Sequence, residues 1–316
     1  MAMKKKAAGR FWKSTTGLTF ITILAANLAC KARLPSAGTS GVKIVGGDPV
    51  AEGEFPQVLA IAVRANDDPK IYVTMCTATL VADGLLVTAA HCLDIIPKTG
   101  DKPDLSTYRI MAGNSWKAAD KPRYFEIKSI AWHENFGRSK QYLADIGFVT
   151  FDQPADFKVE PAPLFTSSTC LQRYFAKVAA EKNDVITFVG YGHVSNIGTS
   201  AMGEKRVVKT RIAVRNSAAA FDDYILIGES NRGTAKGDSG GPAFVLFDKK
   251  MYLFGITSSA DFYGTEEGQQ INNFSAETRV KLIPTYSDWL IEKSGAKIEK
   301  QAFAVCSQVI ENMPTP

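Results

Sequence analysis

The sequence predicts an all-β protein made of two strand-rich units. Short runs of β-branched and aromatic residues, separated by turn residues, follow one another from Ile44 onward. With 316 residues, 45% of them hydrophobic, the chain can bury a substantial core in one large or two small domains. Asp152 to Pro163, a segment with three prolines, separates the runs into an earlier and a later set, so we interpret it as a linker.

Each set contains six predicted strands. They are residues 58–63, 71–77, 85–89, 108–111, 124–132 and 146–151 before the linker, and residues 185–190, 205–214, 224–227, 242–247, 252–257 and 276–282 after it. Pro284 to Lys293 then places Tyr286, Trp289 and Leu290 on one side of a predicted C-terminal helix. Residues 295–316 form a short extension whose pattern allows one more helix.

The net charge of +5 comes from the start of the chain. Met1 to Lys43 holds 8 of the 37 basic residues and no acidic one, which leaves 29 basic against 32 acidic residues in the remainder. The remainder therefore carries a net charge of about −3, and no nucleic-acid partner is expected.

The first 30 residues predict a secretory signal. A basic region, Lys4 to Lys13, precedes an apolar run, Leu18 to Ala29, that is shorter than the ~20 residues needed to cross a bilayer. The run ends at Cys30, and Leu28-Ala29-Cys30 is similar to the end of a bacterial lipoprotein signal, in which the cysteine is lipidated. The alternative is plain export to the periplasm or the exterior, with Cys30 an incidental residue. Residues 31–43 are interpreted as an exposed, cleavable propeptide.

Three strings of residues indicate nucleophilic catalysis. Gly237-Asp238-Ser239-Gly240-Gly241-Pro242 sets a serine in a glycine-rich turn. A serine hydroxyl is a poor nucleophile unless a base takes its proton and N–H groups stabilise the oxyanion that follows. Thr88-Ala89-Ala90-His91-Cys92 offers the base, and Asp145 offers a carboxylate to orient it. The chain order His, Asp, Ser is one of those known for Ser-His-Asp triads.

Together with Ile44-Val45-Gly46-Gly47, these strings resemble the chymotrypsin/trypsin family of serine endopeptidases over about Ile44 to Leu290. The resemblance implies two six-stranded antiparallel β-barrels with the active site between them. Residues 44–163 would form the first barrel and the linker, and residues 164–316 the second barrel, the helix and the tail, together one peptidase domain. We expect a monomer that hydrolyses a protein or peptide substrate and needs no cofactor and no metal ion.

The resemblance also assigns roles to residues. His91 would act as the base, Asp145 would orient it, and Ser239 would attack the peptide carbonyl. The N–H groups of Gly237 and Ser239 match the oxyanion hole, and Ser258 matches a serine that hydrogen-bonds the aspartate.

Activation by cleavage is implied by the same resemblance. A cut between Lys43 and Ile44 by a trypsin-like protease would free an α-amino group that pairs with Asp238. If Cys30 is lipidated, the anchor sits on the propeptide and the same cut releases the enzyme from the membrane.

The 5 cysteines fit an exported protein, because four remain after Cys30 is set aside. The resemblance implies a Cys76–Cys92 disulfide beside the catalytic histidine. It also places the regions of the remaining two, Cys170 and Cys306, next to each other, so these should pair; two free buried thiols are the alternative.

The substrate pocket departs from the trypsin-like pattern. Gly233 stands where trypsin-like members carry an aspartate, and Ala235 stands where most animal members have a disulfide-bonded cysteine. A small, neutral pocket for small or apolar side chains is therefore favoured, because an unpaired cation would be costly there. Glu277 could instead pair with Lys or Arg of a substrate, unless it is a solvated residue or a partner of Arg279. The other expected pocket residues are Thr234, Ser258, Ser259, Ala260 and Ser275.

The sequence argues against two other functions. A catalytically silent homologue, acting as a binding or regulatory module, would be expected to lack a triad residue, and none is substituted here. An esterase of the α/β-hydrolase type would need the chain order Ser, Asp, His, which the positions of His91 and Asp145 exclude.

Overall fold

The computed structural model describes residues 47–66, 68, 70–137, 143–181, 185–193, 203–211, 224–227, 233–247, 250–263 and 275–298. The chain divides into a unit of residues 1–40 and a unit of residues 41–316, and all described residues belong to the second. The predicted signal, the propeptide and residues 299–316 of the extension lie outside them.

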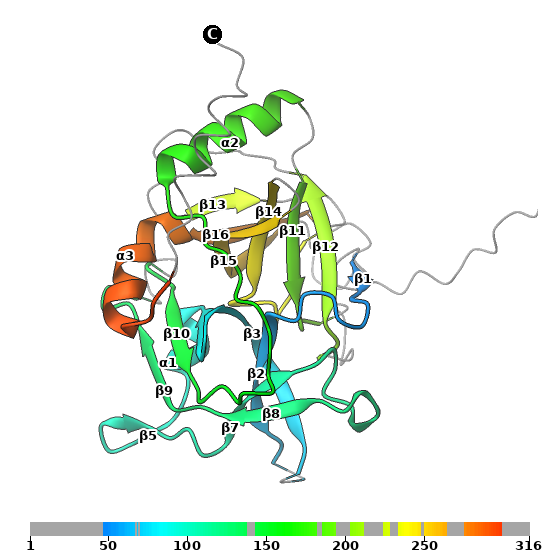
Figure 1. Ribbon diagram of the computed structural model, residues 1–316, viewed down its shortest axis with the longest axis vertical. Helices are drawn as coiled ribbons and strands as arrows, with labels where there is room; N and C mark the ends of the chain where they lie inside the picture. Colours follow the sequence, from blue (N-terminus) through cyan, green and yellow to red (C-terminus); the bar gives the residue numbers. More distant parts are fainter. Residues whose placement is uncertain are drawn as a thin grey trace, which may run out of the picture. The chain divides into compact units, whose positions relative to one another are not determined.

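The first antiparallel sheet has the strand order β8-β7-β2-β3-β4-β10-β9 (Figure 1). Its outermost strands, β8 and β9, are separated in the chain by residues 127 and 128 alone. One bent segment, the predicted strand 124–132, thus pairs with β7 at one edge and with β10 at the other, and closes the sheet into a barrel. The strands are β2 Val58–Arg64, β3 Tyr72–Ala82, β4 Leu85–Thr88, β7 Tyr108–Ala112, β8 Arg123–Glu126, β9 Ser129–Trp132 and β10 Gly147–Thr150.

The second antiparallel sheet has the order β1-β12-β11-β14-β15-β16-β13. It contains all six predicted strands of the later set and adds the two-residue strand β1, which pairs with β12 at the edge. The predicted fold class is confirmed: the described residues are mostly antiparallel β-structure with few helices. The strands are β1 Asp48–Pro49, β11 Val185–Gly190, β12 Arg206–Arg211, β13 Tyr224–Ile227, β14 Pro242–Phe247, β15 Lys250–Tyr263 and β16 Ser275–Leu282.

Strand β2 shows how alternation in the sequence builds two cores. Successive side chains of a strand point to opposite faces. Leu59 and Ile61 pack in the core of the first barrel, whereas Val58 and Ala60 join a cluster that includes Phe244 of the second sheet. All five residues are fully buried. The cluster that contains Val58, Ala60 and Phe244 therefore holds the two sheets together. A site with residues from both sheets requires this contact.

The helices are α1 Ala90–Asp94, α2 Ser168–Glu181 and α3 Ile283–Ser294, with a 3-10 turn at Ala118–Asp120 and a small hairpin of β5 Lys98–Thr99 and β6 Lys102–Pro103. The predicted C-terminal helix corresponds to α3. Tyr286 and Leu290 are buried on it, as its apolar spacing predicts.

Helix α2 was not predicted. The hydroxyl of Ser167 accepts a hydrogen bond from the N–H of Cys170 (3.3 Å) at the start of the helix. Leu171 and Phe175, four residues apart, are buried with Cys170 against the core of the second sheet. The signal was present in the sequence as this spacing, but the prediction placed no element between the linker and the strand at residues 185–190.

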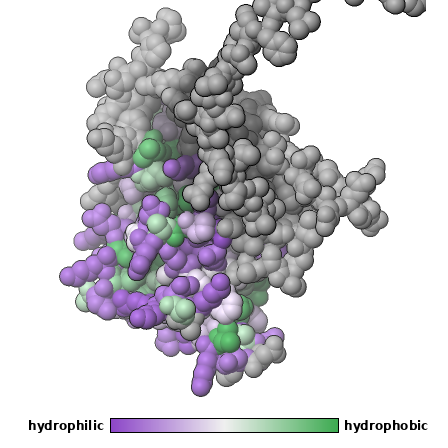
Figure 2. Space-filling model, turned by 90° about the vertical axis from the view of Figure 1, so that its right-hand side faces the viewer, coloured by the Kyte–Doolittle hydropathy of each residue, from purple (hydrophilic) through white to green (hydrophobic). Residues whose placement is uncertain are grey.

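On the face seen in Figure 2, hydrophilic residues dominate and hydrophobic ones form smaller patches between them. The described helices are all too short or too polar to cross a membrane.

Candidate active site

His91 and Asp145 lie beside the adjoining ends of two neighbouring strands of the first sheet, β4 and β10. Helix α1, which carries His91, begins two residues after β4, and Asp145 lies two residues before β10. The antiparallel register pairs Thr88 of β4 with Gly147 of β10, so both side chains emerge beside each other.

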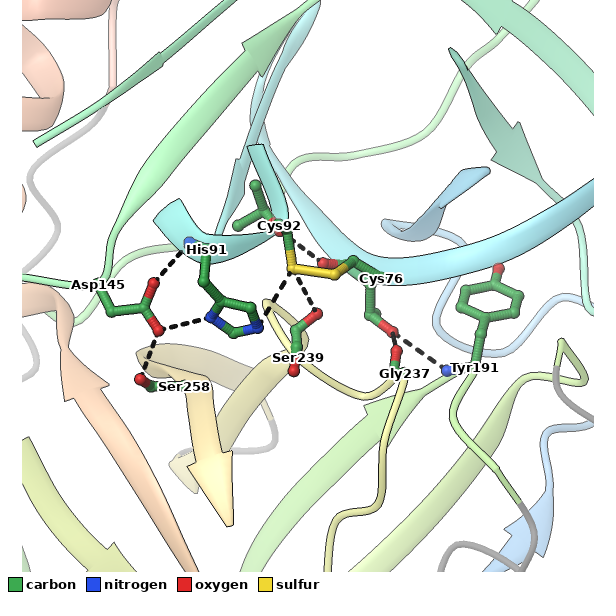
Figure 3. The surroundings of a disulfide bond; sticks show 10 residues. Cys76, His91, Cys92, Asp145, Tyr191, Gly237, Ser239 and Ser258 are labelled. Atoms are coloured by element: carbon green, nitrogen blue, oxygen red, sulfur yellow. Dashed lines mark hydrogen bonds and ion pairs between the residues drawn. A yellow bond between two sulfur atoms is a disulfide. The ribbon is translucent and has the colours of Figure 1, made fainter. Parts of the chain in front are cut away.

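The carboxylate of Asp145 is fully buried and accepts three hydrogen bonds. The imidazole Nδ1 of His91 lies 2.8 Å from Oδ2, and the backbone N–H of His91 donates to Oδ1 at 2.8 Å (Figure 3). The hydroxyl of Ser258 donates to Oδ2 at 2.5 Å. Because Nδ1 donates to a carboxylate, Nε2 is the nitrogen that can accept a proton.

Ser258 reaches the carboxylate from the second sheet through a β-bulge. Strand β15 pairs with β16 at Thr257 and again at Ser259, and the register shifts between them. A bulge leaves one residue out of the ladder and re-aims its side chain. The extra residue here is Ser258, so the irregularity turns its hydroxyl toward Asp145.

Ser239 follows a tight turn, Ala235 to Asp238. The N–H of Asp238 donates to the carbonyl of Ala235 at 3.0 Å, and Gly237 has φ +99°. A positive φ at the third residue is typical of a type II turn and favours glycine there. Within the described residues, the N–H groups of Gly237 and Ser239 donate no hydrogen bond, whereas that of Asp238 does. Two donors are therefore available close to the serine.

The Cys76–Cys92 disulfide, predicted from the sequence, joins β3 to α1. The Cys92 sulfur lies 3.8 Å from Nε2 of His91 and 3.7 Å from the carbonyl oxygen of Ser239. Ser239 thus lies toward the Nε2 end of the imidazole, away from Asp145 (Figure 3). Cys170 is also disulfide-bonded, and its predicted partner, Cys306, lies outside the described residues.

Asp238 is buried, with 2% of its surface exposed, behind the serine turn. Its Oδ2 accepts the N–H of Ala235 at 2.7 Å, and its Oδ1 accepts the N–H of Gly192 at 2.8 Å. Burial raises the pKa of Asp238 to about 7, although both backbone hydrogen bonds act to lower it. The described residues supply no ion pair to this carboxylate.

The family model described as trypsin matches residues 44–290. The chain belongs to the trypsin family. The predicted class of enzyme, a serine-type endopeptidase, agrees with this membership.

Trypsin-family relatives are about one quarter identical to this chain over the aligned residues. The vitellin-degrading protease of Bombyx mori is 26% identical, over 73% of this chain and 81% of that protein. Vitamin K-dependent protein C of Rattus norvegicus is 25% identical, over 79% of this chain and 51% of that protein. Coagulation factor XII of Sus scrofa is 26% identical, over 73% of this chain and 38% of that protein. This chain spans about half or less of the length of the last two.

The expected pocket residues of this trypsin-family chain occupy neighbouring segments. Gly233 and Thr234 are buried ahead of the serine turn, and the Thr234 hydroxyl lies 2.9 Å from that of Thr278 on β16. Ser259 and Ala260 lie on β15, which pairs with the part of β16 that begins at Ser275 and contains Glu277. A cavity of about 880 Å³ lies elsewhere, lined by residues 158–164 and by residues after α3.

Several predicted residues lie outside the described part of the trypsin-family fold, namely Cys30, Lys43, Ile44 and Cys306. One residue in contact with the serine turn was not predicted. Thr77 donates hydrogen bonds to the carbonyls of Gly237 and Ser239. Threonine is common in strands, so its presence at position 77 gave no indication of a role in the site.

Gly240→Ala is expected to abolish most activity. A Cβ at Gly240 would lie 2.0 Å from the hydroxyl of Thr88 and 2.4 Å from the carbonyl of Thr77, so the serine turn must move away from the first barrel. Gly53→Ala is the matched control, since Gly53 has φ +81° against +80° for Gly240 and no atom near its Cβ position. Both variants should lose about 1 kcal/mol of stability, because alanine disfavours the positive φ at each position. A rate assay that shows equal activity for the two would contradict the steric argument.

Proposed function

We propose that this chain is an exported serine endopeptidase that cleaves protein or peptide substrates through an acyl-enzyme. His91, Asp145 and Ser239 would be its catalytic residues. The observation that carries the proposal is the arrangement around the imidazole: a buried carboxylate bonds Nδ1 at 2.8 Å, and Ser239 lies toward Nε2. This is the arrangement of a base held in one tautomer beside a nucleophile.

The proposed reaction begins with attack of Ser239 Oγ on the substrate carbonyl carbon. The hydroxyl proton passes to Nε2 of His91, and Asp145 stabilises the imidazolium that forms. The carbonyl oxygen becomes negatively charged and accepts hydrogen bonds from the N–H groups of Gly237 and Ser239. His91 then gives its proton to the leaving amine, and a water molecule, activated in the same way, releases the acyl group.

Cleavage between Lys43 and Ile44 by a trypsin-like protease is the proposed activation step. The new α-amino group would pair with Asp238, whose buried carboxylate has only backbone partners among the described residues. A buried charge without an opposite charge is costly, so this pairing would stabilise the serine turn.

Residues 1–30 are proposed to direct export, and residues 31–43 to be the propeptide. Residues 44–163 and 164–316 would form one monomeric peptidase domain. Lipidation of Cys30 would tie the uncleaved chain to a membrane, and cleavage after Lys43 would release the enzyme. Recovery of the fully cleaved form in the membrane pellet would contradict this release.

A preference for small or apolar residues before the scissile bond is proposed from Gly233, Thr234 and Ser259. No carboxylate stands at these positions, and the hydroxyls of Thr234 and Thr278 share one hydrogen bond. Lys or Arg of a substrate would therefore lose its hydration without a counter-charge. Glu277 is the residue that would reverse this preference.

The test is a peptide-library profile of the full chain cut after Lys43, with Ser239→Ala as the control. We expect cleavage after small or apolar residues that disappears in the control. Cleavage after Lys or Arg would assign the pocket charge to Glu277 and allow self-activation. Cleavage that is the same in the control, or absent from both, would contradict the catalytic proposal; complete absence would favour the binding or regulatory homologue.

A further inference from the structure

Thr77 lies in β3 directly after the disulfide cysteine Cys76, and it is fully buried. It belongs to the first barrel, where it pairs with Ala60 of β2. Its hydroxyl and its backbone N–H, however, bond to the second barrel, whereas its carbonyl accepts the hydroxyl of Thr88 in the first.

Three hydrogen bonds join Thr77 to segments that follow it by more than 100 residues. Its hydroxyl donates to the carbonyl of Gly237 at 3.0 Å and accepts the N–H of Tyr191 at 3.1 Å. Its backbone N–H donates to the carbonyl of Ser239 at 2.9 Å. In the view of Figure 3, Gly237 and Tyr191 lie on the side of Cys76 away from His91.

These contacts fix two peptide groups of the serine turn. A carbonyl held by a donor sets the plane of its peptide group, because the peptide bond is planar. Thr77 holds the carbonyls of both Gly237 and Ser239, on either side of Asp238. The Asp238 carboxylate holds the N–H groups of Ala235 and Gly192. The turn is thus fastened to the first barrel by Thr77 and to the second barrel by Asp238.

The hydroxyl of Thr77 has a fixed proton direction. It accepts from the backbone N–H of Tyr191, whose fully buried side chain shares its one hydroxyl proton between the carbonyls of Val58 and Gly113. The carbonyl of Gly237 can only accept, so the hydroxyl proton points to it, while the N–H of Tyr191 occupies a lone pair of the hydroxyl. The bond to Gly237 is therefore specific to a hydroxyl group and is not replaced by packing alone.

We propose that Thr77 is a positioning residue for oxyanion stabilisation: with the two barrels docked, its hydroxyl fixes the Gly237–Asp238 peptide group, which lies between the two peptide groups that carry the N–H donors of Gly237 and Ser239. This inference rests on the proposed function and adds a residue to it. Thr77 touches neither substrate nor reacting atoms, and acts through Gly237 and Ser239.

Thr77→Val tests the hydroxyl, because valine keeps the shape and removes the hydrogen bond. The carbonyl of Gly237 and the N–H of Tyr191 then lose their partner. Removal of an oxyanion donor costs about 10²–10³ in kcat, so a displaced donor should cost roughly 10- to 100-fold. KM should change less than threefold, since substrate binds before charge develops. Thr77→Ser keeps the hydroxyl and should restore kcat to within about threefold.

Thr79→Val is the matched control on the same strand. Thr79 is fully buried, and its hydroxyl has no hydrogen-bond partner among the described residues. The same exchange of hydroxyl for methyl should therefore leave kcat unchanged. The pH profile of kcat/KM should also stay in place in Thr77→Val, because the pair of His91 and Asp145 is untouched. If Thr77→Val does not fold, Thr77→Ala replaces it.

The outcomes separate this inference from the proposed function. If Ser239→Ala removes activity and Thr77→Val keeps its kcat, or loses activity only through KM, the role of Thr77 is wrong and the catalytic proposal stands. Equal losses in Thr77→Val and Thr77→Ser, or in Thr77→Val and Thr79→Val, also contradict the role. If Ser239→Ala keeps full activity, both proposals fall.

Discussion

Asp145→Asn is expected to reduce kcat by about 10⁴ at neutral pH, the loss that a wrong imidazole tautomer brings in Ser-His-Asp enzymes. The carboxylate accepts from the Nδ1 and the backbone N–H of His91 and from Ser258. An amide presents only one acceptor oxygen, so its NH₂ group faces the imidazole and donates to it. Nε2 then carries the proton and cannot accept one from Ser239. Steady-state kinetics on the chain cut after Lys43 would measure the loss.

Ser258→Ala is the control for this variant. It removes one of the three donors to the carboxylate and leaves the imidazole tautomer unchanged. We expect a loss of about tenfold or less, the effect of one buried hydrogen bond of about 1 kcal/mol. A loss below tenfold for Asp145→Asn itself would show that this carboxylate does not orient a catalytic base.

Asp238→Asn is expected to change how the stability of the uncleaved chain depends on pH. Burial raises the pKa of Asp238 to about 7, whereas an unfolded aspartate titrates near its ordinary value of about 4. Between these values the folded chain holds a proton that the unfolded chain has released, so the free energy of unfolding falls as the pH rises. The fall should amount to roughly 4 kcal/mol at most, from about pH 4 to about pH 7. The amide variant does not titrate and lacks this fall.

Denaturant unfolding at pH 4.5 and pH 8 measures the effect, with Ser239→Ala in both proteins to prevent self-digestion. The free energy of unfolding of the Asp238→Asn protein should rise relative to that of its parent from pH 4.5 to pH 8; a difference that stays constant would contradict the burial argument.

After cleavage at Lys43 the same substitution should become harmful, because the new α-amino group would lose its partner. Loss of one partner of a buried ion pair costs about 3–5 kcal/mol, so the cleaved Asp238→Asn protein that keeps Ser239 should lose activity by at least 100-fold. Full activity there would exclude the proposed pairing with Ile44.

The strands could be predicted because each carries its own pattern. Residues 58–63 alternate between two buried faces, and the structure places β2 at Val58–Arg64. The segment 124–132 has strand-forming residues throughout, but its bend is set by pairing with β7 at one end and β10 at the other. Such a bend depends on partners far away in the chain, and local pattern does not report it.

The chemistry of the site could be predicted only in part. His91, Asp145 and Ser239 stand in distinctive strings, so resemblance found them. The resemblance also predicted that Ser258 bonds the aspartate, but the bulge that aims its hydroxyl depends on the register between β15 and β16. Thr77 depends on how the two sheets dock, since its partners are Tyr191, Gly237 and Ser239. Contacts of this kind arise from tertiary structure and leave no mark at the residue itself.

The site is also assembled from distant parts of the chain, with consequences for the time during which the protein folds. The bond between His91 and Asp145 closes over 54 residues, and those of Ser258 to Asp145 and Thr77 to Gly237 close over 113 and 160. Contacts between such distant residues form late, because they require long loops to close first. A chain that is still emerging from the ribosome, or that has completed only its first barrel, lacks Ser239 and its turn. Partly folded copies are then substrates at most, and never proteases, for the chains around them.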